Sequence, residues 1–144
     1  MKILVMGLPG SGKSTLSKKL SELLPNSVWL NADRIRHSYN DWDFSLEGRI
    51  RQAKRMEVLS NLCDEDFVIV DFVCPLEVTR LQLSRDITIW MDTTNTSNYP
   101  NTDSIFEPPK YYDYRLVEKD SKKYSRIIYE EILTAKLNSI RPTT

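Results

Sequence analysis

Short apolar segments alternate with amphipathic stretches along most of the chain. Five segments are rich in branched and aromatic residues, with the little polar alternation typical of parallel strands covered on both faces. They are Ile3–Met6, Val28–Leu30, Phe67–Asp71, Ile87–Met91 and Tyr114–Val117. Apolar residues at helical spacing predict helices over Ser14–Leu24, Ser45–Leu62 and Pro75–Leu83, and a last helix from Asp120. This order predicts an α/β fold in which helices flank a mostly parallel, five-stranded sheet in three layers.

A long polar segment interrupts the alternation between Asp92 and Pro109. It is rich in Thr, Asn, Ser, Asp and Pro and has no hydrophobic period, so we predict one extended loop. Loops of this length are usually functional.

The composition limits the class of protein. The 144 residues fit one domain, 1–144, and 20 acidic and 20 basic residues give a net charge of zero. Without a positive field, long polyanions are not favoured, so we expect no nucleic-acid partner. Cys63 and Cys74 are too few for a disulfide framework, and no apolar run approaches the roughly 20 residues that span a bilayer. We therefore expect a cytoplasmic protein without membrane contact.

The first apolar segment is followed at once by a glycine-rich sequence. It reads Gly7-Leu8-Pro9-Gly10-Ser11-Gly12-Lys13-Ser14, a complete GxxxxGK[ST] phosphate-binding loop between a predicted strand and a predicted helix. The glycines let main-chain N–H groups approach the α- and β-phosphates, and the helix adds the positive end of its dipole. Lys13 can span the β- and γ-phosphates, and Ser14, with Thr15 as the less favoured hydroxyl, can coordinate Mg²⁺. We predict that this loop binds ATP or another triphosphate together with Mg²⁺.

A second group of polar residues follows the second and third predicted strands. Asp33 and Arg36 would lie at the carboxyl edge of the sheet, where ligands bind in open α/β folds. Asp33 can accept a proton from an attacking hydroxyl, and Arg36 can bind an anion. Alternatively, Asp33 only caps the short helix that follows. Asp71 ends the third apolar segment, where it either helps to hold Mg²⁺ through water or satisfies N–H groups of a loop.

Taken in order along the chain, these segments resemble the adenylylsulfate kinases, which transfer the γ-phosphoryl group of ATP to the 3′-hydroxyl of adenosine 5′-phosphosulfate. The loop GLPGSGKST is similar to that family's GLSGAGKST, residues 30–37 are similar to LDGDNVRH, and residues 90–93 are similar to FVDT. The likeness extends over most of residues 1–116. It implies a P-loop NTPase fold and a kinase that uses ATP and Mg²⁺.

The resemblance also implies roles around the acceptor. Asp33 would face the acceptor hydroxyl and act with Lys13 as a catalytic residue. Arg36 and Arg49 would bind the phosphosulfate, and Phe44 would stack on the adenine. The same pocket would be lined by Asn40, Gln52, Val73 and Cys74. The expected partner is thus a small nucleotide acceptor, and the resemblance leaves a homodimer open.

The chain departs from that family after Asp92. The family carries a helical lid with basic residues there, whereas this chain has a short polar segment, so we expect the lid to be essentially missing. The sequence predicts an ATP-dependent kinase of a hydroxyl group, with adenylylsulfate as the leading acceptor. Two alternatives stay open: a kinase of a nucleoside, polynucleotide end or modified base, and a non-catalytic ATP-binding module.

Overall fold

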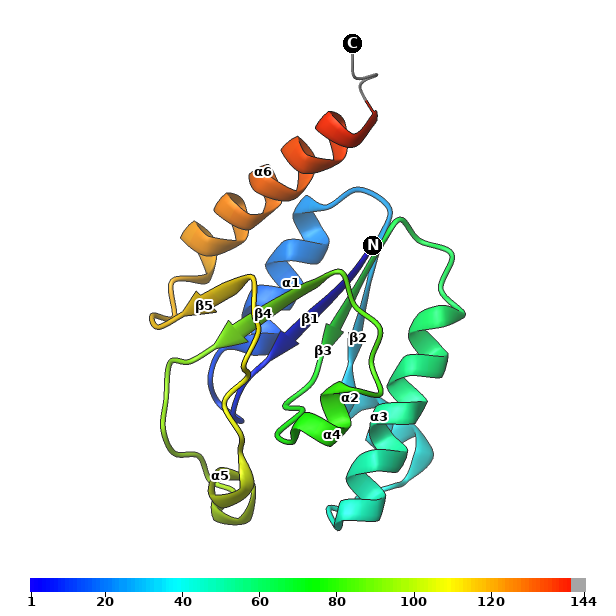
Figure 1. Ribbon diagram of the computed structural model, residues 1–144, viewed down its shortest axis with the longest axis vertical. Helices are drawn as coiled ribbons and strands as arrows, with labels where there is room; N and C mark the ends of the chain where they lie inside the picture. Colours follow the sequence, from blue (N-terminus) through cyan, green and yellow to red (C-terminus); the bar gives the residue numbers. More distant parts are fainter. Residues whose placement is uncertain (141–144) are drawn as a thin grey trace.

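The computed structural model describes residues 1–140, and the last four residues of the predicted 1–144 domain lie outside the described residues. Figure 1 shows a central sheet with helices packed around it. The strands are β1 (Lys2–Met6), β2 (Ser27–Asn31), β3 (Phe67–Asp71), β4 (Ile87–Met91) and β5 (Tyr114–Leu116). The helices are α1 (Lys13–Leu23), α2 (Ala32–Tyr39), α3 (Leu46–Asn61), α4 (Glu77–Arg80), α5 (Pro100–Ile105) and α6 (Ser121–Ile140).

The five strands form one sheet in the order β2-β3-β1-β4-β5, and every neighbouring pair is parallel. Strand β1 is central, with Ile3 opposite Ile69 of β3 and opposite Ile87 of β4. The predicted strands and the predicted α/β class are confirmed. Because the strands are parallel, their carboxyl ends all meet at one edge of the sheet.

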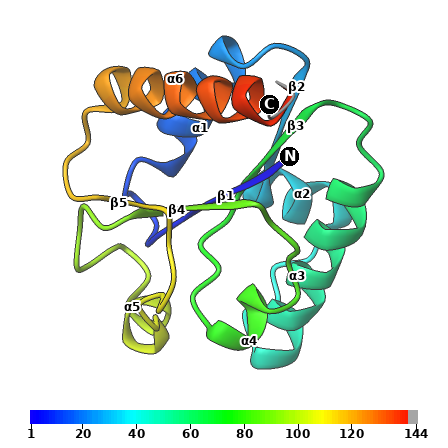
Figure 2. The same cartoon turned by 45° about the horizontal axis from the view of Figure 1, so that its top comes forward.

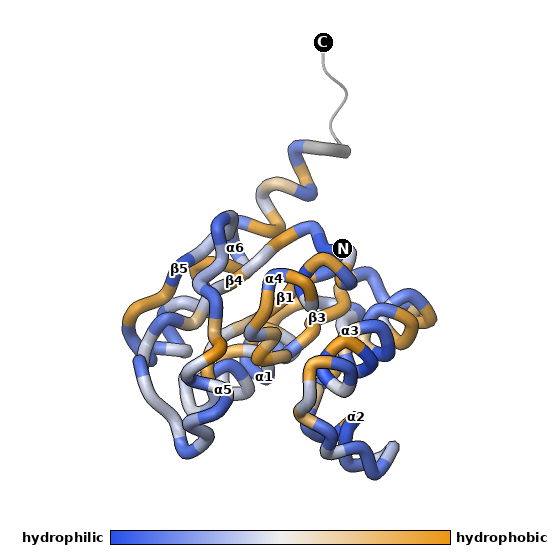
Figure 3. The backbone as a smooth tube through the Cα atoms, turned by 60° about the horizontal axis from the view of Figure 1, so that its bottom comes forward, coloured by the Kyte–Doolittle hydropathy of each residue, from blue (hydrophilic) through white to orange (hydrophobic). Residues whose placement is uncertain are grey.

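Helices cover the two faces of the sheet separately, which gives three layers (Figure 2). On one face, α1 and α6 pack through Leu16, Leu20, Ile128 and Ile132 against alternate residues of the strands. On the other face, α3 packs through Ala53 and Met56 against the remaining strand positions, among them Leu4 and Met6. Figure 3 shows the hydrophobic residues gathered on the central strands and the hydrophilic ones on the outer helices. Burial on both faces explains why the strands lack polar alternation.

Helix α2 begins at Ala32, so Asp33 already lies inside the helix. The Asn31 side-chain oxygen accepts from the N–H of Arg34 at 3.0 Å, so Asn31 is the N-cap residue. The alternative in which Asp33 caps this helix is therefore wrong. Asp33 lies in the first turn, and the described part of the chain offers its carboxylate no hydrogen bond.

Two segments differ from their predicted secondary structure. The predicted helix Pro75–Leu83 is reduced to α4. The buried Arg80 donates from Nε to the carbonyl of Cys74 at 3.0 Å, and this bond holds the chain before α4 in a non-helical conformation. The predicted loop between Asp92 and Pro109 contains α5. Pro100 is the first residue of this helix, a favourable position for proline. Within residues 1–140, no helix combines the length and the apolar character that a membrane span needs.

Candidate functional site

A cavity of about 680 Å³ lies at the carboxyl edge of the sheet, between the glycine-rich loop after β1 and helix α2. Much of what the sequence predicts for the site meets here. The predicted residues that line it are Pro9, Gly10, Gly12, Lys13, Ser14, Thr15, Asp33, Arg36, Phe44, Arg49, Asp71 and Val73. The cavity thus joins the predicted phosphate-binding loop to the predicted acceptor residues.

The loop has the tight backbone that phosphate binding requires. Gly12, the N-cap residue of α1, has φ 99°, and Gly7 has φ 149° with the carbonyl oxygen of Met91 only 2.5 Å from where a Cβ would be. Side chains are strained or excluded at both positions. Leu8 and Ser11 are buried and outside the lining, so only their main-chain groups are suited to contact a phosphate.

Lys13 lies folded back on its own loop. Its Nζ donates to the carbonyl of Leu8 at 2.9 Å, and the side chain is buried. Burial lowers the pKa of Lys13 below its ordinary value, while the nearby Asp71 and Asp33 act in the opposite direction. The phosphate oxygens of a triphosphate in this cavity would be better acceptors for the ammonium than the carbonyl of Leu8, because charged acceptors form stronger hydrogen bonds.

Asp71, at the end of β3, is held by three side chains. Its Oδ2 accepts from Ser14 Oγ at 2.8 Å, from Asn31 Nδ2 at 3.0 Å and from Trp29 Nε1 at 3.1 Å. Burial raises the pKa of Asp71, and the bond from Ser14 and the charge of Lys13 oppose that rise. These three partners are side chains. The alternative in which Asp71 satisfies N–H groups of a loop is therefore wrong. A hydroxyl and a carboxylate in contact are oxygen ligands of the kind that Mg²⁺ prefers, and the pair fits this ion.

Two buried arginines enclose Phe44 on the acceptor side of the cavity. The Cζ atoms of Arg36 and Arg49 lie 4.4 Å and 5.4 Å from the centre of its ring. Arg36 Nη1 donates to the carbonyls of Asp41 and Asp43, and Arg49 Nε donates to the carbonyl of Phe44 at 2.9 Å. Burial lowers the pKa of both guanidinium groups. Each keeps N–H donors that these bonds do not use, so the pair can bind an anion beside an aromatic ring.

Helix α5 closes the cavity from the side opposite α2. Tyr99 and Thr102 line it, and Thr102 Oγ1 accepts from Arg49 Nη2 at 3.1 Å. The expectation that the lid is essentially missing therefore needs correction, since a helix of six residues stands in its place. This short lid carries no cation, because residues 92–109 contain neither Lys nor Arg.

Three predicted pocket residues are placed elsewhere, and the prediction that they line the cavity is wrong. Gln52 is fully buried and donates to the carbonyl of Ala32 at 2.9 Å, so it supports α2 from behind. Cys74 is fully buried, which raises the pKa of its thiol to about 11. Asn40 is exposed and ends α2 in the left-handed conformation with φ 49°.

Several residues of the site were not found from the sequence. Tyr99 and Thr102 line the cavity from the segment that was expected to be a loop. Trp29 lies outside the lining and holds Asp71 from the middle of β2. Lys119 follows β5 and also lines the cavity. Its position just after a strand was the available signal, since the carboxyl ends of parallel strands share one edge.

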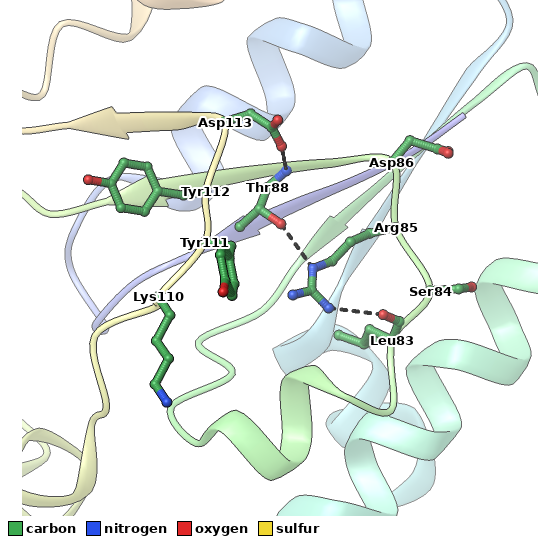
Figure 4. A pocket seen from close by; sticks show the side chains of 9 residues that line it. All are labelled: Leu83, Ser84, Arg85, Asp86, Thr88, Lys110, Tyr111, Tyr112 and Asp113. Carbon is green, nitrogen blue, oxygen red and sulfur yellow. Dashed lines mark hydrogen bonds between the residues drawn. The ribbon is translucent and has the colours of Figure 1, made fainter.

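A second cavity, of about 750 Å³, lies at the opposite end of β4 (Figure 4). Its Arg85, Thr88 and Asp113 are bonded to one another or to the main chain. Arg85 donates from Nε to Thr88 Oγ1 at 2.9 Å and from Nη1 to the carbonyl of Leu83 at 3.0 Å, and Asp113 accepts from the N–H of Thr88. Because these bonds tie the start of β4 to its neighbours, we assign this cavity a structural role and the first one the chemistry.

Comparison with known proteins identifies the family and several relatives of this chain. Residues 1–101 match a family described as chromatin associated protein KTI12. A probable adenylyl-sulfate kinase of Aeropyrum pernix is 34% identical over 86 residues, which are 55% of this chain and 47% of that protein. The L-seryl-tRNA(Sec) kinase of Methanococcus maripaludis is 37% identical over 75 residues, which are 49% of this chain and 29% of that protein. The chain thus spans less than half the length of these curated relatives.

Solved structures show the same fold. The APS kinase CysC of Mycobacterium tuberculosis, in complex with AMPPNP and APS, superimposes with a TM-score of 0.76 at 21% identity, over 91% of this chain and 96% of that one. A shikimate kinase from Acinetobacter baumannii, in complex with shikimate, superimposes with a TM-score of 0.64 at 17% identity, over 94% of both chains. The fold is that of P-loop kinases, and the resemblance to adenylylsulfate kinases is confirmed.

Proposed function

This chain belongs to the family of the chromatin associated protein KTI12, and from that premise we propose that it is a kinase that transfers the γ-phosphoryl group of ATP to a hydroxyl of a nucleotide acceptor. The observation that carries the proposal is the single cavity in which the phosphate-binding loop faces Asp33 and the Arg36–Arg49 pair. A binding module would need the loop alone. A carboxylate that makes no hydrogen bond within residues 1–140, set between the loop and an anion site, suits transfer to a hydroxyl.

On the donor side, the main-chain N–H groups of the loop bind the triphosphate. Lys13 exchanges the carbonyl of Leu8 for phosphate oxygens. Ser14 and Asp71 would hold Mg²⁺, which would supply positive charge to the phosphates. Trp29 and Asn31 fix the Asp71 carboxylate in place, so it needs no reorientation when the nucleotide enters.

On the acceptor side, Asp33 takes the proton of the attacking hydroxyl. The acceptor oxygen forms a bond to the γ-phosphorus while the bond from that phosphorus to the ADP oxygen breaks. Arg36 and Arg49 bind an anionic group of the acceptor, and Phe44 packs on its base. This combination favours adenosine 5′-phosphosulfate, the acceptor implied by the resemblance and by the adenylyl-sulfate kinase relative.

A second acceptor class is favoured by the mouth of the cavity. Trp42, Phe44 and Tyr99 line it with 49%, 47% and 59% of their surface exposed. Exposed aromatic rings offer stacking platforms for bases beyond the reacting nucleotide. The match to an L-seryl-tRNA(Sec) kinase also supports a hydroxyl on a larger, RNA-borne acceptor. Transfer of ³²P from γ-labelled ATP to adenosine 5′-phosphosulfate, to nucleosides and to short RNAs separates the two classes directly.

Replacing Asp33 tests the reaction itself. We expect Asp33→Asn to lower kcat at least ~100-fold on the preferred acceptor, since it removes the proton acceptor but keeps the shape. The dissociation constant of magnesium ATP, measured by calorimetry, should change less than about threefold, because the loop and Lys13 bind the phosphates and Asp33 does not.

Asp64→Asn is the matched control, since Asp64 is an exposed carboxylate outside the cavity. Undiminished turnover in Asp33→Asn would remove Asp33 from the reaction. Tight binding of magnesium ATP without transfer to any acceptor would contradict the proposed kinase activity and favour a non-catalytic ATP-binding module.

A further inference from the structure

The side of the cavity that would bind the triphosphate has few cationic side chains to neutralise the phosphate charge. A triphosphate is highly anionic, and phosphoryl transfer depends on cations placed around it. The short lid has neither Lys nor Arg between residues 92 and 109. Arg36 and Arg49 lie on the acceptor side, where both are bonded to main-chain carbonyls. Of the four cations that line the cavity, this leaves Lys13 and Lys119 beside the loop.

Lys119 lies against the phosphate-binding loop from a distant part of the sequence. It belongs to the turn between β5 and α6, at the same edge of the sheet as the carboxyl ends of β1 and β4 (Figure 1). Its Cγ is 3.8 Å from the point where a Cβ on Gly12 would be, so the stem lies over the residue that precedes Lys13. The backbone around it is fixed, since the Ser121 N–H donates to the Lys119 carbonyl and Asp120 caps α6 at the N–H of Lys123.

The ammonium of Lys119 is free to bind a ligand. The other three lining cations, Lys13, Arg36 and Arg49, each donate to a carbonyl. Lys119 is exposed, and nowhere in residues 1–140 does its Nζ find a hydrogen bond or an ion pair. An unpaired cation that lines a cavity beside a phosphate-binding loop has an anionic phosphate as its natural partner.

We infer that Lys119 binds the α- and β-phosphates of the donor nucleotide and takes the place of the cations that the short lid lacks. The inference rests on the proposed function. Gly12 and Lys13 lie where the loop surrounds the β-phosphate, so a lysine stem over Gly12 carries its charge to that part of the nucleotide. As the bond between the γ-phosphorus and the bridging oxygen breaks, its electron pair stays on the β-phosphate of ADP. Lys119 stabilises this negative charge, whereas Asp33 takes the acceptor proton.

Calorimetry with magnesium ADP tests the inference without any acceptor. Lys119→Met keeps the length of the stem and removes the charge, and we expect it to weaken ADP about tenfold, as for loss of one charge-assisted hydrogen bond. Lys119→Arg should stay within about threefold of the wild type because it restores the cation. Lys122→Met is the matched control, because this lysine is exposed at the start of α6 and lies outside the cavity lining. The ADP affinity of this variant should match that of the wild type.

Turnover gives a second readout that a structural role would not move. With the preferred acceptor, Lys119→Met should lower kcat while the KM of the acceptor stays unchanged, because the acceptor lies on the other side of the cavity. An ADP affinity of Lys119→Met within twofold of the wild type overturns this inference and leaves the proposed function standing. An equal loss in Lys122→Met also overturns it. Folded wild type that binds no magnesium nucleotide at all overturns both.

Discussion

At the scale of single residues, Gly48 shows how the absence of a side chain decides a local path. It lies in the first turn of α3, where Ser45 Oγ accepts its N–H at 3.2 Å as the N-cap residue. A Cβ on Gly48 would overlap the backbone and the carboxyl group of Asp43. The chain before α3 therefore turns back over the helix start at a distance that only glycine permits. Asp43 in turn accepts from Arg36, which positions a cation of the cavity.

We expect Gly48→Ala to destabilise the protein, although alanine is the better helix former by about 1 kcal/mol. The overlap is with backbone atoms, which cannot move without displacing the segment before α3, so a loss of about 2 kcal/mol or more follows. Urea unfolding followed by circular dichroism measures it. Lys54→Ala, at an exposed position of the same helix, should change the free energy of unfolding by less than about 0.5 kcal/mol. A stabilised Gly48→Ala variant would contradict the crowding of this turn.

At the scale of elements, one carboxylate joins the end of α2 to α3. Asp41 accepts from Arg51 Nε at 2.9 Å and from Arg55 Nη2 at 2.9 Å, and only 12% of its side chain is exposed. Arg55 also donates to Gln52, which holds the carbonyl of Ala32 at the other end of α2. Both ends of the helix that carries Asp33 are thus anchored to α3. Gln52 acts on the site only through this support.

This joint predicts a dependence of stability on acid pH. Hydrogen bonds from Arg51 and Arg55 hold the pKa of Asp41 far below its ordinary value of 3.8. The unfolded chain therefore binds this proton first as the pH falls. The stabilisation from Asp41 is complete above about pH 5 and is lost progressively below it, toward the pKa of the folded state.

Asp41→Asn should accordingly be less stable than the wild type at pH 7, and should lose less stability between pH 4 and pH 2.5. Urea titrations at pH 7, pH 4 and pH 2.5 measure both effects. Asp64→Asn is again the control, since its stability should follow that of the wild type. If the free energies of unfolding of wild type and Asp41→Asn differ by the same amount at all three pH values, Asp41 is excluded as the titrating group.

At the scale of the whole molecule, the site is a product of the parallel sheet. Strands β1, β2 and β3 end side by side and deliver the loop, Asn31 with α2, and Asp71 to one edge. Parts of the site that are far apart in sequence therefore meet only in the folded chain. A ligand that touches all of them binds the folded state and not the unfolded one, so it stabilises the entire fold.

We expect magnesium ADP at 100 times its dissociation constant to stabilise the fold by about 2.7 kcal/mol. For a chain of this size that corresponds to a rise in Tm of about 5–10 °C in scanning calorimetry. Lys13→Ala should show no such rise, because the ammonium that meets the phosphates is absent. An equal rise in both proteins would mean that the nucleotide binds elsewhere.

The sequence by itself determined the features that depend on neighbours along the chain. The apolar segments predicted the strands because burial on both faces leaves no room for polar alternation. The loop from Gly7 to Ser14 predicted a phosphate site because its function lies in consecutive main-chain groups. Asp33 and Asp71 were assigned to the site because they directly follow or end strands, and parallel strands share one carboxyl edge.

Only the tertiary structure decided what depends on contacts across the chain. The resemblance to a known family placed Gln52 and Cys74 in the pocket, but both side chains are fully buried in the core, which depends on contacts with segments distant in the sequence. Helix α5 forms in a segment without hydrophobic period and is bonded to the rest of the fold by Arg49 and Thr102. Trp29 and Lys119 reach the site from β2 and from the turn after β5, because strand order brings distant segments to one place.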